Sequence, residues 1–367
     1  MSEREGTIQH CEPARGPSYS ERQRGRSVSS RIIFAAAHVV ADPDDNTKVD
    51  WDATLAFRRH LWQRGLGVAE AMDTAQRGMG LDWPTAAELI KRSAAEADGG
   101  LLACGAGTDQ LTTPPTSLDQ VIAAYTEQLS VVESAGAQPI LMASRQLAAL
   151  ARDADDYHEV YGRLLGQLSD KAILHWLGPM FDPALTGYWG SEDLDEATET
   201  FLAVIEANAE RVDGVKISLL DAEREIQLRR RLPTGVRCYT GDDFNYPRLI
   251  AGDEHGHSDA LLGVFDPLAV VAERAIGRLD LGDIEGFLAT LEPTVPLARH
   301  VFEAPTRFYK TGVVFLAWLG GYQDHFSMIG GLETARSREH LLRCYELAAE
   351  LDLFADPELA ARRAALL

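Results

Sequence analysis

Lysines are scarce in this chain, and one of them occupies an unusual setting. Only five of the 35 basic residues are lysines, and Lys216 lies inside the apolar segment 212–218. A buried lysine is unfavourable unless it is paired or functional. Burial and nearby cations lower its pKa and yield a free amine near neutral pH. Such an amine forms a Schiff base with a carbonyl compound, and the iminium then accepts electrons during cleavage, condensation or dehydration.

The residue type alone leaves two interpretations of Lys216 open. It is either a Schiff-base lysine or a structural lysine that pairs with Asp242 or Asp243. Lys310, which precedes the apolar helix expected over 313–319, is the only other lysine in a comparable setting. The remaining three lie beside a turn, on an amphipathic helix and just before a strand, at Lys48, Lys91 and Lys171.

Eight short apolar segments, separated by segments of helical spacing, must position these residues. Nearly continuous apolar runs are typical of parallel strands that are buried on both faces. Eight such units predict an α/β fold, a (β/α)8 TIM barrel with extra C-terminal helices. The alternative is an open doubly wound sheet, but its nucleotide-binding form lacks a GxGxxG or Walker motif here. The expected strands are 31–40, 67–72, 100–104, 138–143, 172–177, 212–218, 236–239 and 260–264.

The chain divides into three expected parts. Residues 1–30 are polar and without periodicity, which predicts a disordered or draped arm. Residues 31–280 form the barrel. Residues 281–367 are expected to be helical and to pack on the barrel, where they cap it or build an oligomer interface.

The active site of a TIM barrel lies at the C-terminal ends of its strands, so the residues there are the candidates. His175 in the fifth strand is a candidate general acid or base, since imidazole suits that role at neutral pH. Its alternative is a core histidine with satisfied hydrogen bonds. The predicted catalytic pair is Lys216 and His175, and the predicted substrate-binding residues are Asp73, Thr74, Arg77, Ser144, Arg145, Gly241, Asp242 and Asp243.

Several short segments occur in an order and spacing typical of one enzyme superfamily. Besides the opening strand, they are Val49-Asp50, Gly105–Thr108, Val212–Lys216, Tyr239–Asp243 and Ala251–Ser258. Over roughly residues 31–355 they resemble a divergent branch of the dihydrodipicolinate synthase and N-acetylneuraminate lyase superfamily of class I aldolases. The resemblance implies that Lys216 is the Schiff-base lysine. It also implies that no cofactor is needed, because the iminium is the electron sink.

The departures from that pattern bear on the substrate. The family's Gly-Thr-Thr-Gly-Glu segment, which grips a carboxylate, reads Met72 to Gly78 here and contains Asp73. A carboxylate would repel a substrate carboxylate and accept hydrogen bonds from hydroxyls. This favours a polyhydroxylated carbonyl compound, or a keto acid held in part by Arg77 or Arg145. The tyrosine that shuttles protons after strand four has no match, and His175 is the expected replacement.

Composition excludes several partners. The formal net charge of −21 disfavours nucleic acid and anionic membranes, which need basic patches. No apolar run is long enough to span a bilayer, no signal segment is present, and four scattered cysteines indicate a reduced compartment. We therefore expect a cytoplasmic protein without membrane or nucleic-acid partners, and a homo-oligomer, dimeric or tetrameric, that acts on a small carbonyl substrate.

The predicted function is thus that of a Schiff-base lyase, an aldolase or dehydratase acting on a keto acid or sugar-derived acid, with no metal. Two alternatives stay open. One is a metal-dependent aldolase or sugar isomerase on the same barrel, with His255 and His257 as a possible metal pair by spacing and His38, Glu70, Asp73 and His175 as alternative ligands. The other is a barrel without catalysis that binds a sugar acid.

Overall fold

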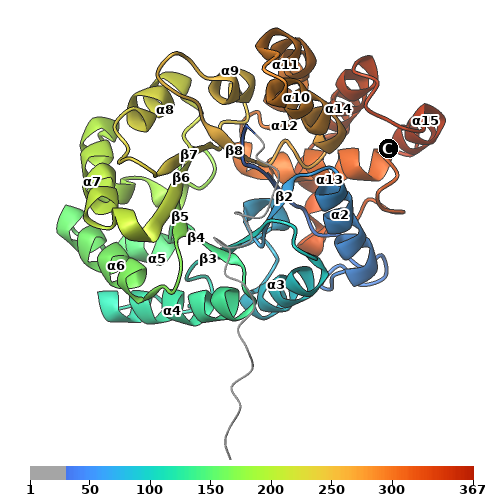
Figure 1. Cartoon of the computed structure of the whole chain (residues 1–367). Coiled ribbons are helices and arrows are strands. Elements are labelled where there is room, and N and C mark those ends of the chain that lie inside the picture. The colour runs from blue at the N-terminus through green and yellow to red at the C-terminus, as the bar shows by residue number, and fades with distance from the viewer. Residues whose placement is uncertain (1–29) are drawn as a thin grey trace, which may run out of the picture.

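The computed structural model describes residues 30–367, so all but the last residue of the predicted N-terminal arm lies outside the described part. Eight parallel strands close into a barrel in chain order, and β1 pairs with β8 (Figure 1). This closure confirms the predicted (β/α)8 barrel and excludes the open sheet. The strands are β1 (Ile33–Ala36), β2 (Gly67–Glu70), β3 (Leu102–Ala106), β4 (Gln138–Leu141), β5 (Ala172–Leu177), β6 (Val212–Ser218), β7 (Arg237–Thr240) and β8 (Asp259–Leu262).

Helices surround the barrel and begin at residues suited to capping. The Asp50 side chain accepts a hydrogen bond from the Ala53 amide, and Asp82 does the same for Thr85, which satisfies amides left free at a helix start. The helices of the barrel are α2 (Trp51–Gln63), α3 (Trp83–Glu96), α4 (Leu118–Ser134), α5 (Arg145–Leu150), α6 (Ala154–Gln167), α7 (Leu194–Ala207), α8 (Ala222–Arg229) and α9 (Tyr246–Ala251).

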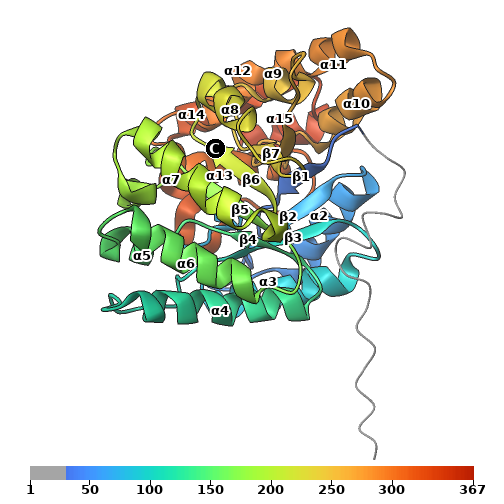
Figure 2. The same cartoon turned by 60° about the vertical axis from the view of Figure 1, so that its left-hand side comes forward.

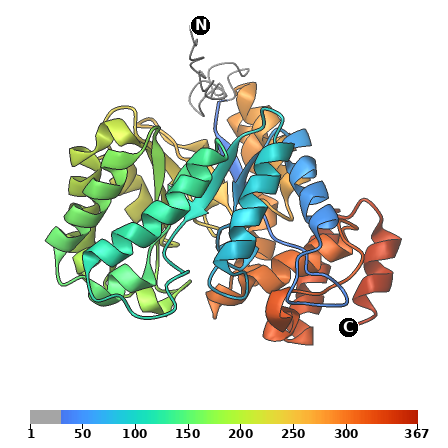
Figure 3. The same ribbon diagram turned by 90° about the horizontal axis from the view of Figure 1, so that it is seen from below.

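The C-terminal helices gather on one side of the barrel, beside α2 and α9 (Figures 1 and 3). Every residue of α13 is buried, so this helix belongs to the core and does not lie on the surface. The expected C-terminal helical region is therefore present, and its central helix is enclosed by the rest of the chain. These helices are α10 (Ala269–Asp280), α11 (Ile284–Leu291), α12 (Val295–Val301), α13 (Tyr309–Leu319), α14 (Arg338–Glu350) and α15 (Pro357–Ala364).

Side chains fill the interior of the barrel. Figure 2 shows its strands from a second direction. Phe34 belongs to the buried cluster there and lies so close to Gly67 that a Cβ on the glycine would be 2.5 Å from the Phe34 ring. Along β6, whose side chains alternate between the two faces, Lys216 shares its face with Gly214 and Ser218. Lys216 pairs in register with His175 of β5 and with Tyr239 of β7.

In residues 30–367, no helix combines the length and apolar character that crossing a bilayer requires.

Candidate functional site

A small polar cavity lies at the C-terminal ends of the strands, where a TIM barrel carries its active site. The volume within which the centre of a water molecule can lie is about 10 Å³, so the cavity has room for about one water. Strands β5 and β6, the segments after β2, β7 and β8, and the start of α13 all contribute to its wall. The lining residues are Met72, Asp73, Thr74, Leu177, Phe181, Lys216, Ser218, Asp243, Gly263 and Tyr309.

Lys216 is the only lysine in this lining, and its surroundings favour a neutral amine. Burial lowers its pKa, although the charges of Asp73 and Asp243 act in the opposite direction. Among the described residues, no carboxylate oxygen lies within the 4.0 Å of Nζ that would define an ion pair. The amine is thus held beside two carboxylates without being tied to either.

Two acids face the same cavity. Asp243 follows β7, and its Oδ1 accepts a hydrogen bond of 2.8 Å from the amide of Val264. Burial raises the pKa of Asp243 to about 7, although this amide and the charge of Lys216 oppose the shift. Because of this pKa, Asp243 can exchange a proton near neutral pH, as a general acid or base must. The second acid, Asp73, begins a short 3-10 turn after β2.

Thr74 and Tyr309 meet at the wall of the cavity. Their hydroxyl oxygens are 2.8 Å apart, and the Tyr309 ring stacks on Phe302 with 4.3 Å between centroids. Burial, followed by the charge of Asp73, raises the pKa of Tyr309 well above its ordinary value. Tyr309 is not among the site residues that the sequence predicts. The only signal was its place next to Lys310, at the start of a long apolar helix.

His175 lies behind the cavity and does not line it. Its Nε2 is 3.1 Å from Oγ of Ser218, which does line the cavity. Burial and, to a smaller extent, the charge of Lys216 hold the pKa of His175 well below its ordinary value, so the ring is neutral. Its Nδ1 has no hydrogen-bond partner within residues 30–367. A contact of His175 with substrate would have to pass through Ser218.

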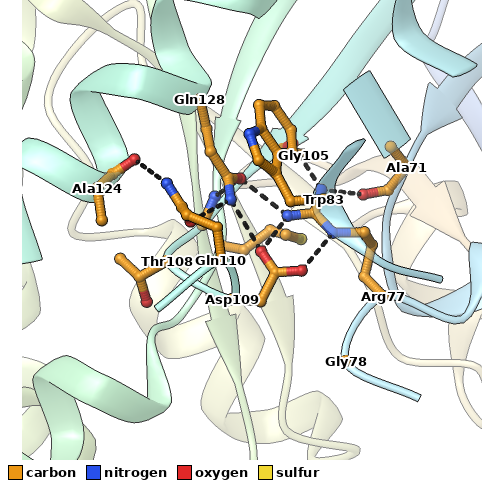
Figure 4. A network of polar contacts seen from close by, with 12 residues as sticks. Ala71, Arg77, Gly78, Trp83, Gly105, Thr108, Asp109, Gln110, Ala124 and Gln128 are labelled. Atoms are coloured by element: carbon orange, nitrogen blue, oxygen red, sulfur yellow. Dashed lines mark hydrogen bonds and ion pairs between the residues drawn. The ribbon is translucent and has the colours of Figure 1, made fainter. Parts of the chain in front are cut away.

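Arg77 does not line the cavity, and its guanidinium group lies in a polar network with residues that follow β3 and with α4 (Figure 4). Its Nε donates to Asp109 over 2.9 Å, and one terminal nitrogen donates to Oε1 of Gln128 over 2.8 Å. The other terminal nitrogen donates to the carbonyl oxygens of Ala71 and Gly105. With its donors used in this way, Arg77 joins three elements and is not free to hold a substrate group.

Ser144 and Arg145 also stay outside the cavity lining. The Ser144 hydroxyl accepts from the Leu147 amide at the start of α5 and lies 2.6 Å from Oγ1 of Thr108. Arg145 is half-exposed and paired with Asp182. The charge of Arg145 contributes to lowering the pKa of Lys310, which also lies outside the cavity lining.

Gly241 and Asp242 have local roles in the turn after β7. A Cβ on Gly241 would overlap Oγ of Ser218 and lie 2.9 Å from Cε of Lys216. The glycine thus leaves the space that the lysine occupies. Asp242 accepts hydrogen bonds from the amides of Phe244 and Asn245, which fixes the turn that precedes α9.

Lys310 is the second buried lysine, and it lies outside the cavity lining. Its Nζ donates to the carbonyl oxygen of Arg307 over 3.1 Å and lies 3.2 Å from Sδ of Met79. Burial lowers the pKa of Lys310 to about 8. Its reactivity would therefore compete with that of Lys216 only if a carbonyl compound could reach it.

The residues of the metal-dependent alternative are separated and engaged elsewhere. Both oxygens of Asp266 contact Nδ1 of His38, and Glu70 forms a buried ion pair with Arg58. The group in residues 30–367 whose ligand atoms lie near one another is in the C-terminal helices, at His300, His340 and Cys344. There the two imidazole rings stack, with 4.2 Å between centroids and 24° between planes, so their in-plane lone pairs do not converge on one point.

Solved structures share this fold at low sequence identity. Dihydrodipicolinate synthase from Aquifex aeolicus is 13% identical with a TM-score of 0.69, and the match covers 89% of this chain and 100% of that one. Dihydrodipicolinate synthase from Thermotoga maritima is 14% identical with a TM-score of 0.69, and the match covers 89% of this chain and 100% of that one. A third structure is that of YagE, an Escherichia coli K12 prophage protein of the dihydrodipicolinic acid synthase family, in complex with pyruvate. YagE is 13% identical with a TM-score of 0.68, and the match covers 89% of this chain and 100% of that one. The resemblance drawn from sequence is confirmed at the level of the fold.

Sequence comparison reaches less far. No curated protein matches the chain. One family model matches it over residues 1–367, and its description is "Protein of unknown function (DUF993)". Because the match extends over the whole chain, the protein belongs to this family.

Proposed function

We propose that the protein is a class I lyase, an aldolase or dehydratase, in which Lys216 forms a Schiff base with a hydroxylated carbonyl compound. The observation that carries this proposal is a buried amine of lowered pKa that faces a polar cavity at the C-terminal ends of the strands. Keto acids and sugar-derived acids are the substrate class. The likeness to dihydrodipicolinate synthase structures supports the same chemistry.

The first step joins the amine to the substrate. Nζ of Lys216 adds to the carbonyl carbon, and the π electrons of the carbonyl move to its oxygen. That oxygen then leaves as water, taking one proton from the nitrogen and one from Asp243, whose pKa of about 7 lets it supply a proton at neutral pH. The product is an iminium ion, in which the nitrogen keeps one proton.

The second step uses the iminium as the electron sink. In aldol cleavage, the Asp243 carboxylate takes the proton of the β-hydroxyl group, an aldehyde leaves, and the electrons of the broken C–C bond form an enamine. In dehydration, the carboxylate takes the α-proton and returns it to the departing β-hydroxyl, which leaves as water. Protonation after cleavage, and hydrolysis in either case, restore the free amine.

The acidic character of the cavity favours substrate hydroxyl groups. Asp73 and Asp243 are hydrogen-bond acceptors, and Arg77 and Arg145, the arginines expected from the sequence to hold a carboxylate, are already paired with carboxylates. The cavity has room for about one water, so a substrate must displace part of its wall. Phe181 lines the cavity from the loop between β5 and α7.

Borohydride trapping tests the proposal directly. Pyruvate and dihydroxyacetone serve as probes, and sodium borohydride reduces any imine to a stable secondary amine. We expect peptide mass spectrometry to place the adduct on Lys216, and we expect none in Lys216→Met.

The matched control is Lys310→Met, which removes the other buried lysine and should leave the adduct in place. An adduct that maps to Lys310, or that persists in Lys216→Met, would overturn the assignment of Lys216. The absence of any adduct in the wild-type protein with both probes would overturn the Schiff-base function.

A further inference from the structure

The C-terminal helices bring a phenol into a cavity that otherwise belongs to the barrel. Tyr309 is the first residue of α13, and it lines the cavity together with Lys216 and Asp243. Its hydroxyl group is 2.8 Å from that of Thr74, which follows β2. Two hydroxyl groups from distant parts of the chain therefore share a hydrogen bond at the wall of the site.

This pair can pass a proton without becoming charged. Burial and the charges of Asp73 and Asp243 raise the pKa of Tyr309, so the phenol form is strongly favoured. A group of this kind cannot hold a negative charge between steps. It can give a proton to one atom while it receives a proton from another, and a hydroxyl neighbour such as Thr74 can do the same, since each is both donor and acceptor.

Schiff-base formation contains a step with that requirement. One proton must move from the nitrogen of Lys216 to the oxygen that leaves as water. Direct transfer would pass through a strained four-membered cyclic transition state, because nitrogen and oxygen are bound to the same carbon. A hydroxyl group that contacts both atoms enlarges this ring. It gives its own proton to the oxygen and takes one from the nitrogen.

We propose that Tyr309, hydrogen-bonded to Thr74, is the catalytic residue that carries this proton from the Lys216 nitrogen to the departing substrate oxygen. The proposal rests on the Schiff-base function above. Tyr309 ends the step as the same phenol, so protons and charges balance without another reactant. Asp243 supplies the second proton of the water, as described above.

Other side chains are less well placed for this transfer. His175 is behind Ser218 and does not line the cavity. The segment after β4 offers Ser144 and Arg145, whose groups cap α5 and pair with Asp182. Among the cavity-lining residues that the structure describes, Tyr309 and Thr74 combine a hydroxyl group with a hydroxyl partner.

Tyr309→Phe tests the role while it keeps the ring that stacks on Phe302. With pyruvate or dihydroxyacetone as probe, we expect the rate of borohydride-trapped adduct formation on Lys216 to fall by about 100-fold or more. The saturating rate should fall, whereas the probe concentration giving half of that rate should change little.

Tyr246→Phe is the matched control. Tyr246 is buried and its hydroxyl group bonds Thr294, so this variant removes a second tyrosine–threonine hydrogen bond outside the cavity lining. It should trap probe at the wild-type rate. Thr74→Val should slow trapping as Tyr309→Phe does, and Thr74→Ser, which keeps the hydroxyl group, should restore most of the rate.

The outcomes separate the two proposals. If the wild-type protein forms no adduct, the Schiff-base function fails, and the role of Tyr309 fails with it. If the wild-type protein and Tyr309→Phe trap both probes at equal rates, only the role of Tyr309 is overturned. A loss of equal size in Tyr246→Phe would also overturn it, because the effect would then follow from packing.

Discussion

At the residue scale, the pKa values of Lys216 and Asp243 depend on the charges that lie close to them in the small cavity. The amine of Lys216 is made less basic by burial and more basic by Asp73 and Asp243. The same proximity acts on Asp243, whose pKa of about 7 is lower than burial alone would make it, because the charge of Lys216 opposes the shift. The two groups therefore titrate as an interacting pair.

The pair predicts how the reaction responds to pH. Above about pH 7 Asp243 is ionised and raises the pKa of Lys216, so Asp243→Asn should lower that pKa further. Asparagine keeps an oxygen acceptor for the Val264 amide. We expect the pH profile of borohydride trapping to shift to lower pH in this variant. A pH profile of Asp243→Asn that is not shifted from that of the wild-type protein would contradict the coupling.

At the scale of elements, the position of Lys216 depends on close packing between β6 and the turn after β7, which contains Gly241. Gly241→Ala would put a Cβ against Oγ of Ser218, the carbonyl oxygen of Ile217 and Cε of Lys216. We expect this variant to lose most trapping at Lys216 and to be less stable by about 1–3 kcal/mol, as overpacked sites are. Rates and thermal melting would measure the two effects.

Gly166→Ala gives the contrasting result. A Cβ at this glycine of α6 meets no atom within 4 Å, and alanine favours a helix over glycine. We expect a gain of about 0.5–1 kcal/mol in the free energy of unfolding and unchanged trapping. If Gly241→Ala behaved like Gly166→Ala, Gly241 would not be required for the position of Lys216.

Sequence patterns predicted the elements of the barrel well because buried parallel strands are continuous apolar runs. The run 212–218, for example, matches β6 in both bounds. The short helix α5 was not predicted, since six residues hold too little periodicity to stand out. The site was predicted in part. Lys216, Asp73, Thr74 and Asp243 meet at the cavity because they sit at strand ends, which chain order reveals.

The remainder of the site depends on contacts that chain order does not reveal. Arg77 lies at a strand end as well, but its side chain turns toward Asp109 and Gln128 (Figure 4). Tyr309 enters from α13, and nothing in its local sequence shows which part of the barrel the helix covers. The direction of a side chain and the docking of a distant helix are tertiary properties.

Across the whole molecule, one buried acid should make stability depend on pH. Glu225 accepts hydrogen bonds from Ser258 and Thr240, and burial raises its pKa to about 8. In the unfolded chain a glutamate titrates near ~4.3, so between these values the native state holds a proton that the unfolded state lacks. The contribution of this group to stability is thus present below about pH 4 and is lost as pH rises to about 8, by up to ~1.4 kcal/mol per unit.

Glu225→Gln should flatten that dependence, because the amide carries no titrating proton. We expect the melting temperature of the variant to fall less than that of the wild-type protein between pH 5 and pH 9. Asp243, with a pKa of about 7, contributes in the same direction and remains in the variant, so part of the slope should persist. Parallel curves for the two proteins would contradict a buried, protonated Glu225.

The order of synthesis gives α13 a further meaning. Lys216 and all eight strands are synthesised before Tyr309, because α13 follows the barrel in the chain. Until α13 docks, the nascent barrel lacks Tyr309 from the lining of its cavity. If Lys216 forms a Schiff base as proposed, its amine would at that stage be open to carbonyl compounds other than the substrate. On the proposed mechanism, such a barrel would also lack the proton carrier for rapid imine formation. The late helix would therefore delay full reactivity until the substrate pocket is complete.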